Sequence, residues 1–345
     1  MKRLLLGVAM LLVLFQGTAQ AGMGLAELPG LADDGPVTLF YPSSAPEGTL
    51  QRSPFVLSLA PDGALQQGNG RLIIISHGSG GAPWVFTDLA RVLVQAGFVV
   101  ALPRHRGDNH LDHSAPGPDS WRLRPVEVSR AIDALAQHPV WSTQLSLDRV
   151  GIYGTSAGGH TALSLAGGRW SDAQFLRHCE QHLSEDYSSC VGFVTRLRSN
   201  GWDWLKKAVA IGILRQRFQD PTWHTHHDAR IAVALAAVPF AADFDMGSLA
   251  SPPIPLGLAS ADGDINQMPR FHAQAVLATC GNCEHVVDLK EAGHGAYLSP
   301  LPVFKPHSVE AELLNDPPGF DRRLLPEAHQ AIARFFSRHL LSNHP

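Results

Sequence analysis

Short apolar runs alternate with amphipathic stretches along most of this 345-residue chain. Apolar runs bounded by turn residues predict buried strands, and apolar positions three and four residues apart predict helices. After a polar, proline-rich lead-in, this pattern predicts strands at 55–59, 71–76, 98–102, 148–153, 231–238, 254–258 and 286–289, and helices at 86–95, 121–137, 160–166, 271–277 and 326–341. Such alternation favours an α/β fold, a mostly parallel sheet with helices on both faces.

The alternation stops between about residues 168 and 228, a stretch rich in Arg, His, Ser and Trp. We call this stretch the insertion. An insertion that follows the helix at 160–166 would overhang the carboxyl ends of the strands, where α/β sheets bind ligands. We therefore predict one domain, residues 22–345, with the insertion as its cap or lid. A passive surface excursion is the alternative.

The amino-terminal residues have the features of a signal peptide. Lys2 and Arg3 precede an apolar run at 4–15, and Ala19-Gln20-Ala21 offers small residues in an A-x-A cleavage pattern. The run is too short to favour a membrane-spanning helix, and no cysteine lies near the cleavage position to carry a lipid. We predict that residues 1–21 are removed and that the protein is periplasmic or secreted without a stable membrane anchor; an uncleaved anchor is the alternative.

The composition is that of an ordinary globular protein, with 45% hydrophobic and 17% charged residues. The formal net charge is -4, and no run of Lys and Arg occurs, which argues against a nucleic-acid partner.

Export changes the interpretation of the four cysteines, because disulfides persist in oxidising compartments. We predict the pairs Cys179–Cys190 and Cys280–Cys283. A redox role for Cys280-Gly281-Asn282-Cys283 is less favoured, because that motif normally opens a helix, whereas here a helix precedes it and a strand follows. A zinc site fits neither the spacing nor the compartment.

Catalytic chemistry is indicated by Gly154-Thr155-Ser156-Ala157-Gly158, placed between a predicted strand and a predicted helix. A G-x-S-x-G sequence at such a junction is typical of a nucleophile elbow, which exposes the serine hydroxyl at the sheet edge. Small residues are needed because a Cβ at Gly154 or Gly158 would clash where strand and helix nearly touch. We predict Ser156 as a nucleophile.

A serine nucleophile needs a base, and the base needs an acid to orient it. Two segments downstream follow strands and so point toward the same sheet edge: 259–264, which contains Asp262 and Asp264, and 291–297, which contains His294. Gly293 and Gly295 let the chain fold His294 over the serine. We predict His294 as the base and prefer Asp264 as the acid, with Asp262 as the alternative.

The anionic intermediate of acyl transfer needs two backbone N–H donors. We predict that one comes from Ala157, the residue after the nucleophile, and the other from Ser79 in the glycine-rich segment 77–81 that follows the strand at 71–76. A phosphate cradle is not favoured, because no G-K-[ST] follows the glycines.

Five segments resemble the serine branch of the α/β-hydrolase superfamily, and within it the predicted dienelactone-hydrolase and platelet-activating-factor-acetylhydrolase-like group. They are S-H-G-S-G at 76–80, P-R-H-R-G-D-N at 103–109, G-T-S-A-G-G at 154–159, A-D-G-D at 261–264 and G-H-G at 293–295. The resemblance implies an α/β-hydrolase fold and an esterase that acts on a small-molecule carboxylic ester without a cofactor or metal. Ser156 departs from true dienelactone hydrolases, which resemble this fold but use a cysteine nucleophile, and the long insertion departs from the compact members of the group. Candidates for lining the substrate pocket are Trp84, Trp202 and Trp204.

Two rival functions remain open. Residues 105–113 contain His105, His110 and His113 in a pattern that resembles the zinc motif of metallo-β-lactamase-type hydrolases, and His224, His226 and His227 form a second cluster, so a zinc hydrolase is one alternative. The other is a non-catalytic binding protein on a hydrolase fold.

Overall fold

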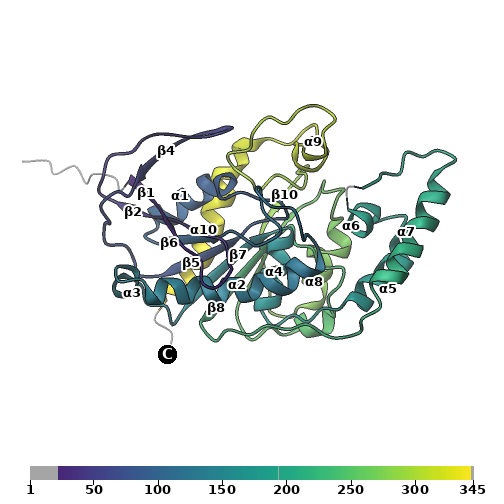
Figure 1. The fold of residues 1–345 in the computed structure, drawn as a ribbon, viewed down its shortest axis with the longest axis horizontal. Helices are drawn as coiled ribbons and strands as arrows, with labels where there is room; N and C mark the ends of the chain where they lie inside the picture. Colours follow the sequence, from purple (N-terminus) through teal and green to yellow (C-terminus); the bar gives the residue numbers. More distant parts are fainter. Residues whose placement is uncertain (1–21, 193, 343–345) are drawn as a thin grey trace, which may run out of the picture.

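The computed structural model describes residues 22–192 and 194–342, so the predicted signal peptide at 1–21 lies outside the described residues. Ten strands form one sheet in the order β10-β9-β8-β7-β5-β6-β2-β1-β4-β3 (Figure 1). The strands are β1 Gly22–Leu28, β2 Val37–Ser43, β3 Gly48–Arg52, β4 Phe55–Pro61, β5 Leu72–Ser76, β6 Val99–Pro103, β7 Val150–Thr155, β8 Ile231–Ala237, β9 Leu256–Ala261 and β10 Glu284–Leu289. From β6 to β10 all neighbours are parallel, as the alternating pattern predicts.

Helices cover both faces of the sheet. Side chains along each central strand point alternately to opposite sides, so both faces carry apolar side chains that the helices bury. In β5, Ile73 and Ile75 enter the core beneath α1 (Thr87–Gln95) and α10 (Leu325–Leu341). Leu72 and Ile74 enter the core on the other face, beneath α2 (Pro118–Gln137), α4 (Ala157–Leu165) and α8 (Ala273–Thr279). The shorter helices are α3 Trp141–Gln144, α5 Asp172–His182, α6 Tyr187–Val191, α7 Asp203–Arg217 and α9 Val309–Leu314, with 3-10 turns η1 Pro83–Phe86, η2 Met246–Leu249, η3 Pro269–Phe271 and η4 Arg322–Leu324.

The interpretation of the residues before 55 as a polar lead-in is wrong. They form β1, β2 and β3, and β2 is buried along its whole length. β1 and β2 pair antiparallel, and β2 pairs antiparallel with β6, so these strands widen the parallel sheet at one edge. Phe40 and Tyr41 of β2 point to opposite faces and enter the two cores.

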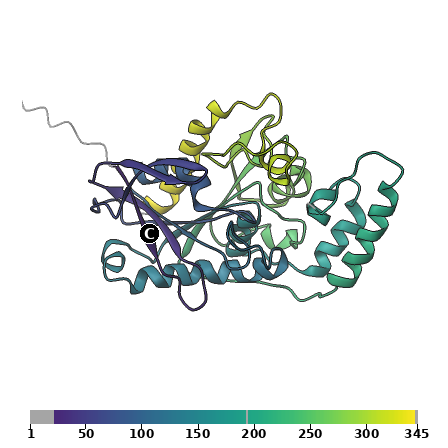
Figure 2. The same cartoon turned by 45° about the horizontal axis from the view of Figure 1, so that its top comes forward.

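The insertion forms α5, α6 and α7, and its helices lie at the end of the molecule opposite β1–β4 in both ribbon views (Figures 1 and 2). It has a small core of its own, built from Phe175, Leu183, Tyr187 and Leu214 around the Cys179–Cys190 disulfide, which packs on the segment after β8.

The second disulfide, Cys280–Cys283, closes the turn between α8 and β10, so all four cysteines are paired as the sequence predicts. Within the ranges 22–192 and 194–342, none of the helices has the length and apolar character needed to cross a membrane.

Candidate active site

Ser156 occupies the single residue between β7 and α4, in a backbone conformation that side chains rarely adopt (φ 55°, ψ -119°). Three main-chain hydrogen bonds hold it there: its N–H donates to Ala237 (3.1 Å), and its carbonyl accepts from His160 (3.0 Å) and Phe240 (3.1 Å). Strain of this kind persists only where the surroundings enforce it, and it is concentrated at functional sites.

Two glycines make this turn possible. A Cβ on Gly154 would lie 1.9 Å from the Gly158 carbonyl oxygen, and a Cβ on Gly158 would lie 1.8 Å from that of Ser76. Both obstacles are main chain and cannot turn away. α4 begins at Ala157, three residues earlier than the sequence pattern predicts. The prediction started late because Gly158 and Gly159 are typical turn residues, and their close packing is not visible in the sequence.

The two segments that follow β9 and β10 meet beside this turn. His294 Nδ1 lies 2.6 Å from Asp264 Oδ2, and both side chains are buried. The other carboxylate oxygen of Asp264 accepts the main-chain N–H groups of Asn266 (2.8 Å) and Gln267 (2.9 Å). A carboxylate acceptor at Nδ1 keeps the proton of a neutral ring on that nitrogen, which leaves the lone pair of Nε2 available as a base.

Asp262, the alternative acid, points elsewhere. Its Oδ1 accepts the N–H of Glu291 (2.6 Å), and its Oδ2 lies 3.6 Å from Lys290 Nζ near the surface. The geometry therefore favours Asp264 as the partner of His294.

The Ser156 hydroxyl contacts a residue that the sequence analysis missed. Gln267 Nε2 donates to Ser156 Oγ at 3.2 Å, and among the described residues no hydrogen bond joins Ser156 to His294. Gln267 Oε1 is buried and has no hydrogen-bond partner in the described part of the chain. Catalytic hydrogen bonds are often open in ligand-free enzymes and tighten on substrate binding. The signal that could have pointed to Gln267 is its position three residues after Asp264, in the same loop.

The glycine-rich segment after β5 passes over the serine. A Cβ on Gly78 would lie 3.4 Å from the Cβ of Ser156. In the described structure no hydrogen bond occupies the N–H of Ser79, and the N–H of Ala157 is one of the first-turn donors that a helix leaves without an internal partner. These are the two donors that the sequence predicts for an oxyanion hole.

The loop that carries Asp264 is also bonded to the insertion. Ser189 Oγ donates to the Asn266 carbonyl (3.0 Å). His272 Nδ1 accepts the N–H of Ala241 (3.0 Å), so its Nε2 carries the proton and faces Asp186 Oδ2 (3.2 Å). The acid and the insertion thus belong to one hydrogen-bonded unit.

One solved structure with a similar fold is a ferulic acid esterase from Streptomyces cinnamoneus. The two structures superpose with a TM-score of 0.57 over 95% of this chain and 94% of that chain, at 15% sequence identity. The chain has the α/β-hydrolase fold. No protein-family model matches the sequence, and no curated protein matches it either.

In this α/β-hydrolase fold, the histidine-rich segment 105–113 lies behind the glycine-rich loop. Burial lowers the pKa of His105 well below its usual range. His105 Nδ1 lies 2.6 Å from Glu127 and Nε2 lies 2.8 Å from the Ser76 hydroxyl, so both ring nitrogens have protein partners. Among the described residues, no three His, Cys, Asp or Glu side chains are arranged to hold a metal ion.

The second histidine cluster is spread over separate contacts. The ring of His224 packs on Trp170 with centroids 4.5 Å apart, and His226 Nε2 lies 2.9 Å from the Ser129 hydroxyl.

The three tryptophan candidates fall in two elements, with Trp84 in η1 and both Trp202 and Trp204 at the start of α7. Trp84 packs on the core of the α1 face beneath the Arg52 guanidinium, 5.4 Å from the ring centroid. Trp202 and Trp204, at the start of α7, are 68% and 67% exposed.

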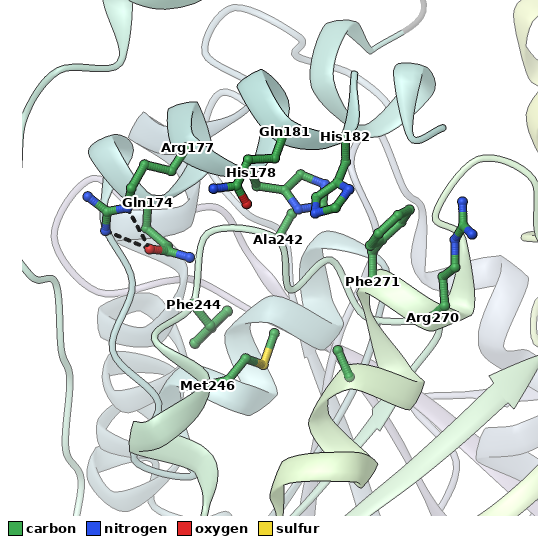
Figure 3. A pocket seen from close by; sticks show the side chains of 11 residues that line it. Gln174, Arg177, His178, Gln181, His182, Ala242, Phe244, Met246, Arg270 and Phe271 are labelled. Carbon is green, nitrogen blue, oxygen red and sulfur yellow. Dashed lines mark hydrogen bonds between the residues drawn. The ribbon is translucent and has the colours of Figure 1, made fainter. Parts of the chain in front are cut away.

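A cavity of about 270 Å³ lies between α5 and the segments that precede η2 and α8. Figure 3 shows His178, His182 and Phe271 on one side of it and Met246 on another. Its lining includes neither Ser156, Asp264 or His294 nor the glycine-rich loop, so this cavity is separate from the candidate active site.

Proposed function

We propose that this protein is an exported serine hydrolase of carboxylic esters. The observation that carries the proposal is the Asp264–His294 hydrogen bond of 2.6 Å at the sheet edge where the strained turn presents Ser156. An orienting acid, a histidine base and a serine hydroxyl are the parts of a catalytic triad.

In the proposed reaction, Ser156 Oγ turns from Gln267 toward His294 and gives its proton to Nε2 while attacking the ester carbonyl carbon. The negative charge then develops on the carbonyl oxygen, where the N–H groups of Ser79 and Ala157 donate to it. His294 passes the proton to the leaving alcohol as the carbon–oxygen bond breaks. Water repeats these steps on the acyl-enzyme and releases the acid.

The finer assignments belong to the same proposal. The resemblance to the dienelactone-hydrolase and platelet-activating-factor-acetylhydrolase-like group supports a small ester substrate. The leader pattern at 1–21 and the two disulfides support export. The bonds that join the insertion to the acid loop support a role for the insertion as a cap over the substrate.

The test is covalent labelling of the purified protein with a fluorophosphonate probe, combined with hydrolysis of p-nitrophenyl esters from acetyl to palmitoyl and of a feruloyl ester. We expect labelling at Ser156, and we expect Ser156→Ala to abolish labelling and to lower kcat by about 10⁴-fold or more with the fold intact. Near-wild-type hydrolysis by Ser156→Ala would contradict the proposal. Loss of activity on chelation that zinc restores would favour the metal alternative.

A further inference from the structure

Asp108 and Arg124 form an ion pair with both side chains fully buried, immediately behind the glycine-rich loop. Their closest atoms, Arg124 Nη2 and Asp108 Oδ2, are 2.8 Å apart. Neither residue belongs to the triad or touches the serine hydroxyl. A buried ion pair contributes little net stability compared with well-packed apolar side chains, so its presence here calls for another explanation.

The contacts of Asp108 lead to the oxyanion loop. Its second oxygen, Oδ1, accepts the Ser79 hydroxyl (2.5 Å) and the Gly80 N–H (3.0 Å). Arg124 also donates to the carbonyl oxygen of His77 and holds Ser120 Oγ at 2.8 Å. The pair therefore binds the loop on both sides of the Ser79 N–H while leaving that N–H free.

The charge of the carboxylate matters to this arrangement. Burial raises the pKa of Asp108, but Arg124 and the hydrogen bonds from Ser79 and Gly80 together hold it below its ordinary value. An ionised carboxylate accepts hydrogen bonds at both oxygens. An amide in its place has one acceptor and one donor, so it would have to present its NH2 group either to Arg124 or to the loop.

We propose that Asp108, held by Arg124, is a positioning residue that fixes the Ser79 N–H where the oxyanion of the ester forms. The inference rests on the proposed function, because it requires an oxyanion. Asp108 acts through the loop and does not touch the substrate. Arg124 balances its charge, so that no unpaired negative charge lies behind the site where a second one develops.

The test compares Asp108→Asn with the wild type on a p-nitrophenyl ester and on the matching thionoester, in which sulfur replaces the carbonyl oxygen. Sulfur is larger and a weaker acceptor, so an ordered oxyanion hole favours the oxoester. We expect Asp108→Asn to lower kcat on the oxoester by about 10- to 100-fold, with KM within about threefold, and to reduce the oxoester-to-thionoester rate ratio. A purely structural role would not change that ratio.

Asp243→Asn is the matched control, because Asp243 is equally buried, pairs with His160 at 3.0 Å and has no bond to the oxyanion loop. We expect it to keep the wild-type rate ratio. Ser79→Ala removes only the hydroxyl bond to Asp108 and keeps the main-chain donor. We expect about a 5- to 20-fold fall in kcat and a smaller shift in the ratio. This variant decides the question if Asp108→Asn does not fold.

A wild-type ratio and kcat in folded Asp108→Asn, or in Ser79→Ala should Asp108→Asn not fold, would overturn the inference while leaving the proposed function intact. Failure of the proposed function is a separate result, since the wild-type protein would then show no hydrolysis that depends on Ser156.

Discussion

Two of the buried histidine–aspartate pairs, His294–Asp264 and His160–Asp243, invite comparison, because we propose a catalytic role for the first alone. His294 and Asp264 are 2.6 Å apart at the ends of β9 and β10. His160 and Asp243 are 3.0 Å apart, with His160 on α4 one helical turn after Ser156. Both pairs bring an imidazole nitrogen to a carboxylate oxygen in a buried setting.

The difference lies in what surrounds each ring. His160 is enclosed by the rings of Trp121, Trp170, Phe240 and Phe244, and in the described part of the chain its Nδ1 has no hydrogen-bond partner. The side chain of His160 is fully buried. His294, in contrast, follows β10 at the sheet edge that carries Ser156, and its Nδ1 is the nitrogen that faces the carboxylate. We infer that a buried His–Asp pair serves as a catalytic base only where its ring can reach a nucleophile. The pair alone does not indicate catalysis, because such pairs also occur within the core.

Replacing each histidine with glutamine is the strongest test of the difference between the two pairs. We expect His294→Gln to lower kcat by about 10⁴-fold or more, because no other base can take the serine proton. We expect His160→Gln to keep kcat within about tenfold and to lower the free energy of unfolding by about 1–3 kcal/mol, the cost of disturbing a buried hydrogen bond. Ester hydrolysis and urea unfolding measure the two effects. Equal losses of kcat in both variants would show that the distinction is wrong.

The carboxylates give the next largest contrast. We expect Asp264→Asn to lower kcat by about 10²- to 10⁴-fold, because an amide no longer holds His294 in the reactive tautomer. Asp262→Asn serves as its control, since Asp262 bonds to Glu291 and Lys290 instead. We expect it to retain kcat within about threefold. Steady-state hydrolysis decides between them, and a larger loss in Asp262→Asn would make Asp262 the acid.

His329 is a buried histidine without a carboxylate partner among the described residues, and it makes the free energy of unfolding depend on pH. Burial lowers the pKa of His329 on α10 to about 4, and the weaker pull of Asp88 does not offset this. Below about pH 6.5 the unfolded chain binds a proton that the folded protein refuses, so the free energy of unfolding falls as the pH drops toward 4. Between pH 7 and 5 this amounts to about 2 kcal/mol for one such group.

We expect His329→Leu to reduce that fall by about 2 kcal/mol, measured by urea unfolding at pH 7 and pH 5. Part of the fall should remain, because burial also lowers the pKa of His77 and His105 well below the usual range. An unchanged pH dependence in the variant would contradict the assignment.

The sequence predicted the parts that local pattern controls. Apolar runs located β5 to β10, and in β5 to β9 the apolar sequence is nearly continuous because these strands are buried on both faces. Short loops after β9 and β10 then placed Asp264 and His294 at one edge. β1 and β2 were missed because neither continues the alternation of strand and helix. β2 is held in the sheet by pairing with β6, which is remote in sequence, and β1 by pairing with β2 and β4.

The hydrogen bonds around Ser156 and behind the glycine-rich loop could not be predicted, because they join residues far apart in the chain. His105 resembled a metal ligand in sequence, but its partners Ser76 and Glu127 lie 29 and 22 positions away. Arg124 sits on an amphipathic helix, where a charged residue normally faces water. Gln267 has no motif, and only the folded loop brings it to Ser156.

The bonds of Ser189 and Asp186 to the acid loop limit how this protein can be remodelled. A cap with no hydrogen bonds to the loop of the acid could be exchanged between relatives as a unit. Here Ser189 donates to the Asn266 carbonyl, two residues after Asp264, and Asp186 faces His272 at the start of α8. We therefore expect that recombination which replaces the insertion without these two side chains would displace the loop of Asp264 before it altered the choice of substrate.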